Sequence, residues 1–281
     1  MSTPSPSSEE IAWTDACIRW DDEPPPSAHD ATGNSKDTDE EEEQGWDPFQ
    51  DPDPTEEFTF RFDAGDREIR LTLTGYKADA DQTWQSTGLT LWKASHALND
   101  YILDHAQTWI GHRVLELGAG LGVCGILLDR LWNDPSATIC ITDGDTQALA
   151  LLRQNIQRNN AYATCRQLLW GKETAKAFDQ EPYQVIMASD IIYAPSVLVP
   201  LWETIQCLLD TQGVFVLAFA QRKVPVQLDD VLKTSKDFGF VHKCVLQDSE
   251  QELFLYEFRR ELEWIAPIRT TLGATVAFNS H

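Results

Sequence analysis

Hydrophobic and polar residues alternate in two neighbouring segments, 58–62 and 68–73, which are joined by a short Ala-Gly-Asp link at residues 64–66. Alternation with a period of two is typical of β-strands, and a short link that contains glycine predicts a β-hairpin. From Thr87 to about His105 the apolar side chains recur at helical spacing. This segment predicts a helix that covers the first strand of a core sheet.

Short apolar runs and amphipathic segments alternate along the middle of the chain. The predicted strands are 113–117, 138–142, 164–169, 184–189 and 213–220, and the predicted helices are 121–132, 145–158, 196–210 and 226–237. This alternation predicts a doubly wound, mostly parallel sheet of the Rossmann-like type. Residues 241–246 and 252–258 follow with only a short polar link, which predicts an antiparallel terminal hairpin. The expected fold class is therefore α/β, with a seven-stranded sheet and a separate N-terminal β-hairpin.

Charge divides the chain into unequal parts and suggests its domain organisation. Up to Glu57 there are eighteen acidic residues against Arg19 and Lys36, a net charge of −16 out of −23 for the whole chain. We expect residues 1–55 to form an acidic, Pro- and Ser-rich, disordered leader. The predicted order after it is a β-hairpin at 56–85, the main domain at 86–260 and an extension of unknown role at 261–281.

The same composition argues against several classes of function. So acidic a chain is not expected to bind nucleic acid through a generic phosphate-neutralising face. The sequence has no apolar run of membrane-spanning length and no secretory signal, so we expect a cytoplasmic protein that is also nuclear in some settings, without membrane contact. Its six cysteines include no C-x-x-C pair and its six histidines no H-x-x-x-H pair, so no metal site is predicted.

A glycine-rich run carries the strongest functional signal. The apolar strand that ends at Glu116 breaks into Gly118, Ala119 and Gly120 before the next helix. Glycines let the backbone turn sharply and approach a ligand, and the N-terminus of the helix then faces that ligand. Spacing alone leaves a dinucleotide pattern open, because Gly120-x-Gly122-x-x-Gly125 also fits G-x-G-x-x-G. Read together with Glu116, the run resembles the first motif of the S-adenosylmethionine-dependent methyltransferases more than that of a dehydrogenase, and a carboxylate at this position suits the sulfonium ligand that the resemblance implies.

The ends of three later strands carry further candidate groups, and parallel strands bind ligands beyond their carboxyl ends. Asp143 is placed to accept hydrogen bonds from both ribose hydroxyls of a nucleoside, whereas Asp145 is expected to cap the next helix. Trp170 either stacks on an adenine or is a half-buried residue at a strand edge. The resemblance to methyltransferases implies that Asp190 and Tyr193 orient an amine and a methyl group for transfer. The alternative is that Asp190 caps the following helix and Tyr193 packs beneath it.

Five motifs occur in a fixed order and together resemble one family. They are Thr87-Gly88-x-x-x-Trp92, Glu116-Leu117-Gly118-Ala119-Gly120-x-Gly122, Thr142-Asp143, Trp170-Gly171 and Asp190-x-x-Tyr193. The ordered set resembles the family 16 seven-β-strand (class I) methyltransferases, which include many protein-lysine methyltransferases, over about residues 85–220. This resemblance implies S-adenosylmethionine as the cofactor. Its lining residues would be Trp92, Gly118, Ala119, Gly120, Asp143, Trp170 and Ser189, together with Glu116.

The resemblance departs from the family at Ser189, where an alanine is common, although serine is small enough to fit. It implies an N-methyltransferase acting on a lysine of a protein, and an acidic surface suits a basic protein partner. Two alternatives share the cofactor half, namely a small-molecule N-methyltransferase and a non-catalytic cofactor-binding interaction module. A nicotinamide-dependent oxidoreductase fits less well, because the chain has no room for a second domain.

Overall fold

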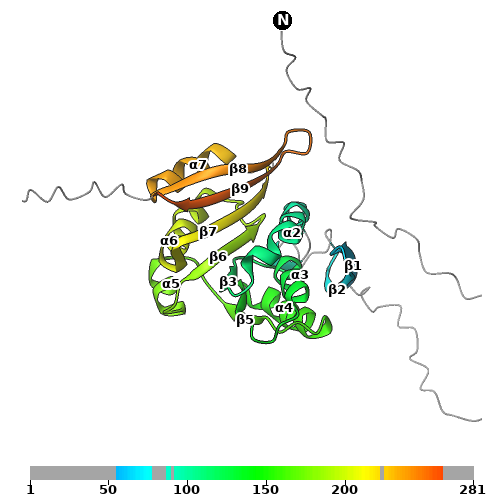
Figure 1. Cartoon of the computed structure of the whole chain (residues 1–281). Helices are drawn as coiled ribbons and strands as arrows, with labels where there is room; N and C mark the ends of the chain where they lie inside the picture. Colours follow the sequence, from blue (N-terminus) through cyan, green and yellow to red (C-terminus); the bar gives the residue numbers. More distant parts are fainter. Residues whose placement is uncertain (1–54, 78–86, 90–91, 222–224, 262–281) are drawn as a thin grey trace, which may run out of the picture.

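The computed structural model describes residues 55–77, 87–89, 92–221 and 225–261. The predictions made for the leader up to residue 54 and for the extension from residue 262 lie outside the described residues. Within the described part, the element order confirms an α/β chain in which strands and helices alternate (Figure 1).

The core is a seven-stranded sheet with the order β5-β4-β3-β6-β7-β9-β8. Its strands are β3 (Val114–Glu116), β4 (Ile139–Asp143), β5 (Thr164–Gln167), β6 (Tyr183–Ser189), β7 (Leu209–Ala220), β8 (Phe240–Asp248) and β9 (Leu253–Arg260). Strands β3 to β7 pair in parallel, whereas β9 runs antiparallel to both β7 and β8. The predicted mostly parallel sheet with a terminal antiparallel hairpin is confirmed.

Helices cover both faces of this sheet because successive strand residues point to opposite sides. In β6, Val185 and Met187 pack in one apolar cluster, and Ile186 and Ala188 pack in the other. The first cluster includes residues of α2 (Ala94–His105), α3 (Val123–Trp132) and α4 (Thr146–Arg158). The second includes residues of α5 (Lys172–Phe178), α6 (Leu198–Leu208) and α7 (Leu228–Asp237). Both faces of the strands are therefore buried, which explains their continuous apolar runs.

Two features differ from the sequence prediction. Helix α5 was not predicted, because only Ala175 of its seven residues is buried and it therefore lacks an apolar stripe. Helix α2 was expected to cover the first core strand, but it packs instead against β6, β7 and β9. The apolar face of α2 also packs against α3. The apolar periodicity therefore predicted correctly that this segment forms a buried helix, but the predicted neighbour was wrong.

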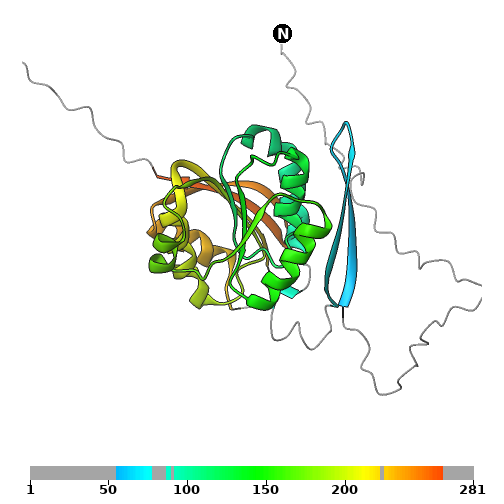
Figure 2. The same ribbon diagram turned by 90° about the horizontal axis from the view of Figure 1, so that it is seen from below.

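The predicted N-terminal hairpin is present as β1 (Thr55–Asp63) and β2 (Glu68–Tyr76), paired antiparallel in a separate two-stranded sheet. Its alternating residues bury one face, which includes Phe60, Phe62, Leu71 and Leu73. This face joins the same cluster as α2, α3 and α4, and β2 contacts both α3 and α4. Figure 2 shows the hairpin on the outer side of these helices, so it forms an additional layer on this face.

The strand order reverses between β3 and β6, which follow each other in the sheet but not in the chain. In open parallel sheets, the carboxyl ends of the strands at such a reversal form the ligand crevice. This edge is therefore where the candidate residues are expected to meet. No helix in the described part of the chain is both long and apolar enough to cross a bilayer.

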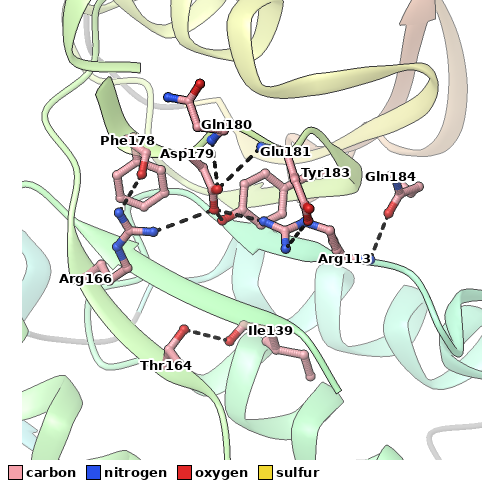
Figure 3. Close-up of polar contacts among 10 residues, drawn as sticks. All are labelled: Arg113, Ile139, Thr164, Arg166, Phe178, Asp179, Gln180, Glu181, Tyr183 and Gln184. Carbon is pink, nitrogen blue, oxygen red and sulfur yellow. Dashed lines mark hydrogen bonds and ion pairs between the residues drawn. The ribbon is translucent and has the colours of Figure 1, made fainter. Parts of the chain in front are cut away.

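The opposite edge of the sheet is held by polar contacts around Asp179 (Figure 3). Its Oδ2 lies 2.8 Å from Arg113 Nη2 and 3.7 Å from Arg166 Nη1, and it accepts a hydrogen bond of 2.9 Å from the Tyr183 hydroxyl. Arg113 precedes β3, and Asp179 precedes β6. The carboxylate thus fastens together the starts of neighbouring strands, far from the ligand edge.

Replacing Asp179 with alanine should lower the free energy of unfolding by about 1–3 kcal/mol, because two arginines lose an ion-pair partner and the Tyr183 hydroxyl loses its acceptor. Urea denaturation at neutral pH measures this change. Glu181→Ala is the matched control, since Glu181 is 73% exposed and pairs with Arg113 alone at 3.2 Å. That control should cost about 0–1 kcal/mol. Equal losses in the two variants would contradict the central role of Asp179.

Candidate functional site

A cavity of about 640 Å³ lies at the carboxyl ends of β3, β4, β5 and β6. All ten residues predicted from the sequence line it, namely Trp92, Glu116, Gly118, Ala119, Gly120, Asp143, Trp170, Ser189, Asp190 and Tyr193. The structure thus brings the whole predicted set together, while the individual role of each residue stays a prediction. Further lining residues that the sequence analysis missed are Ser95, Leu168, Leu169, Ile191 and Val197. Leu168 and Leu169 follow β5, so the rule for strand ends would have found them.

The glycine turn between β3 and α3 needs glycine for two reasons. Gly118 and Gly120 have φ angles of 60° and 54°, in the left-handed region that side chains disfavour. A Cβ on Gly118 would lie 2.7 Å from Ile191 Cγ2, and one on Gly120 would lie 3.1 Å from the Gly88 carbonyl oxygen. The turn is therefore packed from both sides, and it presents backbone to the cavity.

Glu116 ends β3 on the face that α3 covers, and its side chain is almost fully buried. Its Oε2 accepts a hydrogen bond of 2.8 Å from the Gly125 N–H in the first turn of α3. Burial raises the pKa of this carboxyl to about 8, although the Gly125 N–H acts in the opposite direction. Because Glu116 also lines the cavity, a positively charged ligand there would favour its ionised form.

Asp143 ends β4 and connects the second strand end to the glycine turn. Its Oδ2 accepts from the Gly120 N–H at 2.9 Å, and its Oδ1 accepts from the Asp145 N–H at 2.9 Å. Each carboxylate oxygen can accept a second hydrogen bond, so both remain able to bind ribose hydroxyls from the cavity side. Burial raises the pKa of Asp143 as well. Asp145 accepts from the Gln147 N–H and caps α4, so its predicted structural role is confirmed.

Two tryptophans line the cavity, one before the glycine turn in the sequence and one after it. Trp92 lies just before α2, and its carbonyl accepts hydrogen bonds from the Ser95 hydroxyl and backbone N–H. Trp170 follows β5, and its Cζ2 would lie 3.3 Å from a Cβ on Gly118. Trp170 is therefore packed against the turn and also faces the cavity, as stacking on an adenine requires.

Asp190 directly follows β6 and connects three elements. Its Oδ2 accepts from the Ala94 N–H at 2.8 Å and its Oδ1 from the Ala220 N–H at 3.1 Å. These groups belong to the start of α2 and the end of β7. One alternative from the sequence is that Asp190 caps the helix that follows it. This alternative is wrong, because Asp190 accepts from the start of α2, a helix that precedes it in the chain. This arrangement favours Asp190 as a positioning residue for the cavity wall.

Tyr193 lines the cavity but is 47% exposed, so it does not pack beneath the following helix as the other alternative required. Leu169 also lines the cavity and is 58% exposed. The cavity is therefore open to the surface at these two side chains.

The described residues that line the cavity include acidic side chains but no basic ones. Glu116, Asp143, Asp145 and Asp190 line it, and none of the described lining residues is a lysine, arginine or histidine. A site that gathers carboxyl groups without cations favours a positively charged ligand. This property argues against the pyrophosphate of a dinucleotide and agrees with a sulfonium compound.

Comparison with known families decides between these ligand classes. Residues 77–238, more than half of the chain, match the family model described as lysine methyltransferase. The chain belongs to this family. It is an S-adenosylmethionine-dependent methyltransferase, and the resemblance inferred from its ordered motifs is confirmed.

Several curated proteins are similar to this methyltransferase over most of its length. The protein N-lysine methyltransferase METTL21A of Mus musculus is 26% identical, with 64% of this chain and 81% of the mouse protein covered. The EEF1A lysine methyltransferase 3 of Xenopus tropicalis is 27% identical, with 60% of this chain and 74% of the frog protein covered. The calmodulin-lysine N-methyltransferase of Arabidopsis thaliana is 24% identical, with 60% of this chain and 56% of the plant protein covered.

The residues of the cavity fit S-adenosylmethionine. A side chain at Gly118 or Gly120 would fill the space against Ile191 and Gly88, so this backbone is shaped for close approach. Asp143 offers acceptors for a ribose, Trp170 offers a ring face, and Glu116 offers a carboxyl group to a positive charge. The methyltransferase would hold the donor with these groups.

The buried Glu116 should make cofactor binding depend on pH. Below a pKa of about 8 its carboxyl is protonated, and binding a positively charged donor then requires release of that proton. The affinity for S-adenosylmethionine should therefore rise several-fold per unit between about pH 6 and about pH 8 and level off above. Isothermal titration across this range measures it. Glu116→Gln should bind more weakly and lose the dependence, and an equal slope in that variant would exclude Glu116 as its source.

Proposed function

We propose that this methyltransferase methylates the side-chain amine of a lysine in a protein that presents a basic segment. The observation that carries this proposal is the opening of the cavity at Tyr193 and Leu169, which are about half exposed although both line it. A closed pocket would favour a small metabolite, whereas an opening to the surface suits a lysine that enters on a protein. The mouse, frog and plant relatives are all named as lysine methyltransferases, which supports the same class of substrate.

Charge supports a basic partner. The chain carries a net charge of −23, and the cavity is lined by carboxyl groups. An acidic protein attracts a positively charged segment over distances of about a Debye length, and this attraction weakens as salt is added. We therefore expect the methylated lysine to lie among other basic residues of its protein.

Methyl transfer requires the protein to align the methyl group of the donor with the amine of the acceptor. S-adenosylmethionine, when bound, supplies a methyl group on a positively charged sulfur. The glycine turn and Asp143 would hold the donor, while Asp190 would keep α2 and β7 in register around it. Tyr193 at the opening would orient the incoming amine through its hydroxyl. The amine must arrive neutral, because only its lone pair can displace the sulfur in line.

A labelling experiment tests the proposal. The purified protein is incubated with radiolabelled S-adenosylmethionine and a lysate of cells that lack this protein. We expect a discrete labelled protein whose methylated lysine, located by mass spectrometry, lies in a positively charged segment. Gly118→Val is the inactive control, because its side chain would collide with Ile191. Label found in small molecules would instead identify a metabolite enzyme. Cofactor binding without labelled product would favour a non-catalytic interaction module.

Tyr193→Phe separates orientation from binding. Removing the hydroxyl should lower kcat on the methylated protein by about 10–100-fold, while the affinity for S-adenosylhomocysteine changes less than about twofold. Steady-state kinetics and calorimetry measure the two effects. The matched control is Tyr162→Phe, because Tyr162 is 51% exposed and does not line the cavity. If kcat of Tyr193→Phe equals that of the control, the Tyr193 hydroxyl has no part in transfer.

A further inference from the structure

The outer edge of β2 is paired with side chains instead of a strand. Asn159, directly after α4, accepts from the Thr72 N–H through Oδ1 at 2.9 Å and donates to the Thr72 carbonyl through Nδ2 at 2.8 Å. Asn155 of α4 makes the same pair of bonds with Thr74, at 2.8 Å and 3.1 Å. A carboxamide carries the N–H and C=O groups of a peptide, so the two asparagines take the place of a neighbouring strand.

The spacing of the two elements explains why this pairing fits. Alternate residues of a strand, such as Thr72 and Thr74, point their backbone groups to the same edge and lie about 6.6 Å apart. Four residues along a helix rise about 6 Å, which is the separation of Asn155 and Asn159. The hairpin is therefore fixed to α4 in one register, and a shift by one residue would turn both threonine backbones away.

Asn155 makes one bond that Asn159 does not. Its Nδ2 also donates to the Leu121 carbonyl at 3.1 Å, inside the glycine turn that lines the cavity. Asn155 is completely buried, so both of its amide hydrogens and its oxygen are used within the protein. Gly75 of β2 packs against the side chain of Leu121 at the same place. The hairpin thus contacts the glycine turn in two ways, through Asn155 and directly between Gly75 and Leu121.

We propose that Asn155 is a positioning residue for S-adenosylmethionine binding and that the β1–β2 hairpin acts on the cofactor site through it. The bond to Leu121 fixes the peptide between Leu121 and Gly122, where the turn enters α3. The bonds to Thr74 hold the amide in the orientation that this contact needs. The hairpin lies before residue 77, where the family match begins, and none of its described residues lines the cavity, so its effect on the site is transmitted through contacts with the glycine turn.

Asn155→Ala and Asn159→Ala form a matched pair for the test, since each loses two bonds to β2 and one further bond. The further bond of Asn159 goes to the Asn155 carbonyl at 2.8 Å, and only that of Asn155 goes to Leu121. We expect Asn155→Ala to weaken S-adenosylhomocysteine binding by about five- to tenfold, the loss of one or two hydrogen bonds. It should raise KM for S-adenosylmethionine by a similar factor and leave kcat at saturation nearly unchanged. Asn159→Ala should change both constants less than about twofold, although both variants lower Tm.

Calorimetry on the full chain separates the possible outcomes. The inference rests on the cofactor site described above, so wild-type binding of S-adenosylhomocysteine is the first measurement, and its absence would overturn that site. If the wild type binds, equal dissociation constants in Asn155→Ala and wild type would overturn only the role of Asn155. Equal weakening in the two alanine variants would also overturn it, because it would show a general effect of the hairpin.

Hydrogen exchange of the wild type gives a test that needs no variant to fold. Coupling between two sites is reciprocal, so a cofactor that stabilises the glycine turn must also stabilise the contact of Asn155 with β2. Saturating S-adenosylhomocysteine should therefore slow exchange of the Thr74 N–H several-fold, as well as that of residues 118–123. Protection of the turn with unchanged exchange at Thr74 would overturn the proposed connection.

Discussion

Carboxyl groups at the ends of strands hold the backbone of the cavity in shape. A sharp turn or the start of a helix leaves N–H groups without partners, and burying them unpaired is costly. Glu116, Asp143 and Asp190 each accept from such groups, in α3, the glycine turn, and the boundaries of α2 and β7. Without these acceptors, neither the left-handed turn nor the entry to α2 would keep the geometry on which the cavity depends.

This arrangement has a cost that a ligand can reduce. Burial destabilises the charged forms of these carboxyl groups and repulsion between neighbouring carboxylates adds to it, which explains the raised pKa values of Glu116 and Asp143. A positively charged donor relieves that repulsion, whereas its neutral product after methyl transfer does so less. The same residues that build the turn therefore favour binding of the donor over the product.

The sequence predicted much of the fold and the site because both depend on local chemistry. Glycines, strand-end carboxylates and periodic apolar residues are visible within short windows, and the structure confirms the sheet and gathers the predicted residues around one cavity. The partners of Asp190 were not predictable, because Ala94 and Ala220 lie 96 and 30 residues away from it. Helix α5 escaped prediction because it buries a single side chain. Asn155 lies inside α4 and Asn159 directly after it, and neither shows its role in the sequence, since that role depends on a strand more than 80 residues earlier.

The hairpin is synthesised before the helices that cover it. Thr72 is synthesised 87 residues before Asn159, its partner on the other side of the contact. At ribosomal speeds of about 5–20 residues per second, its apolar face waits roughly 4–17 seconds for the helices that cover it. During that interval the two strands have an unpaired edge and exposed phenylalanines, which are the features that chaperones bind. The apolar face of the hairpin is thus an aggregation-prone surface of the nascent chain until α4 has left the ribosome.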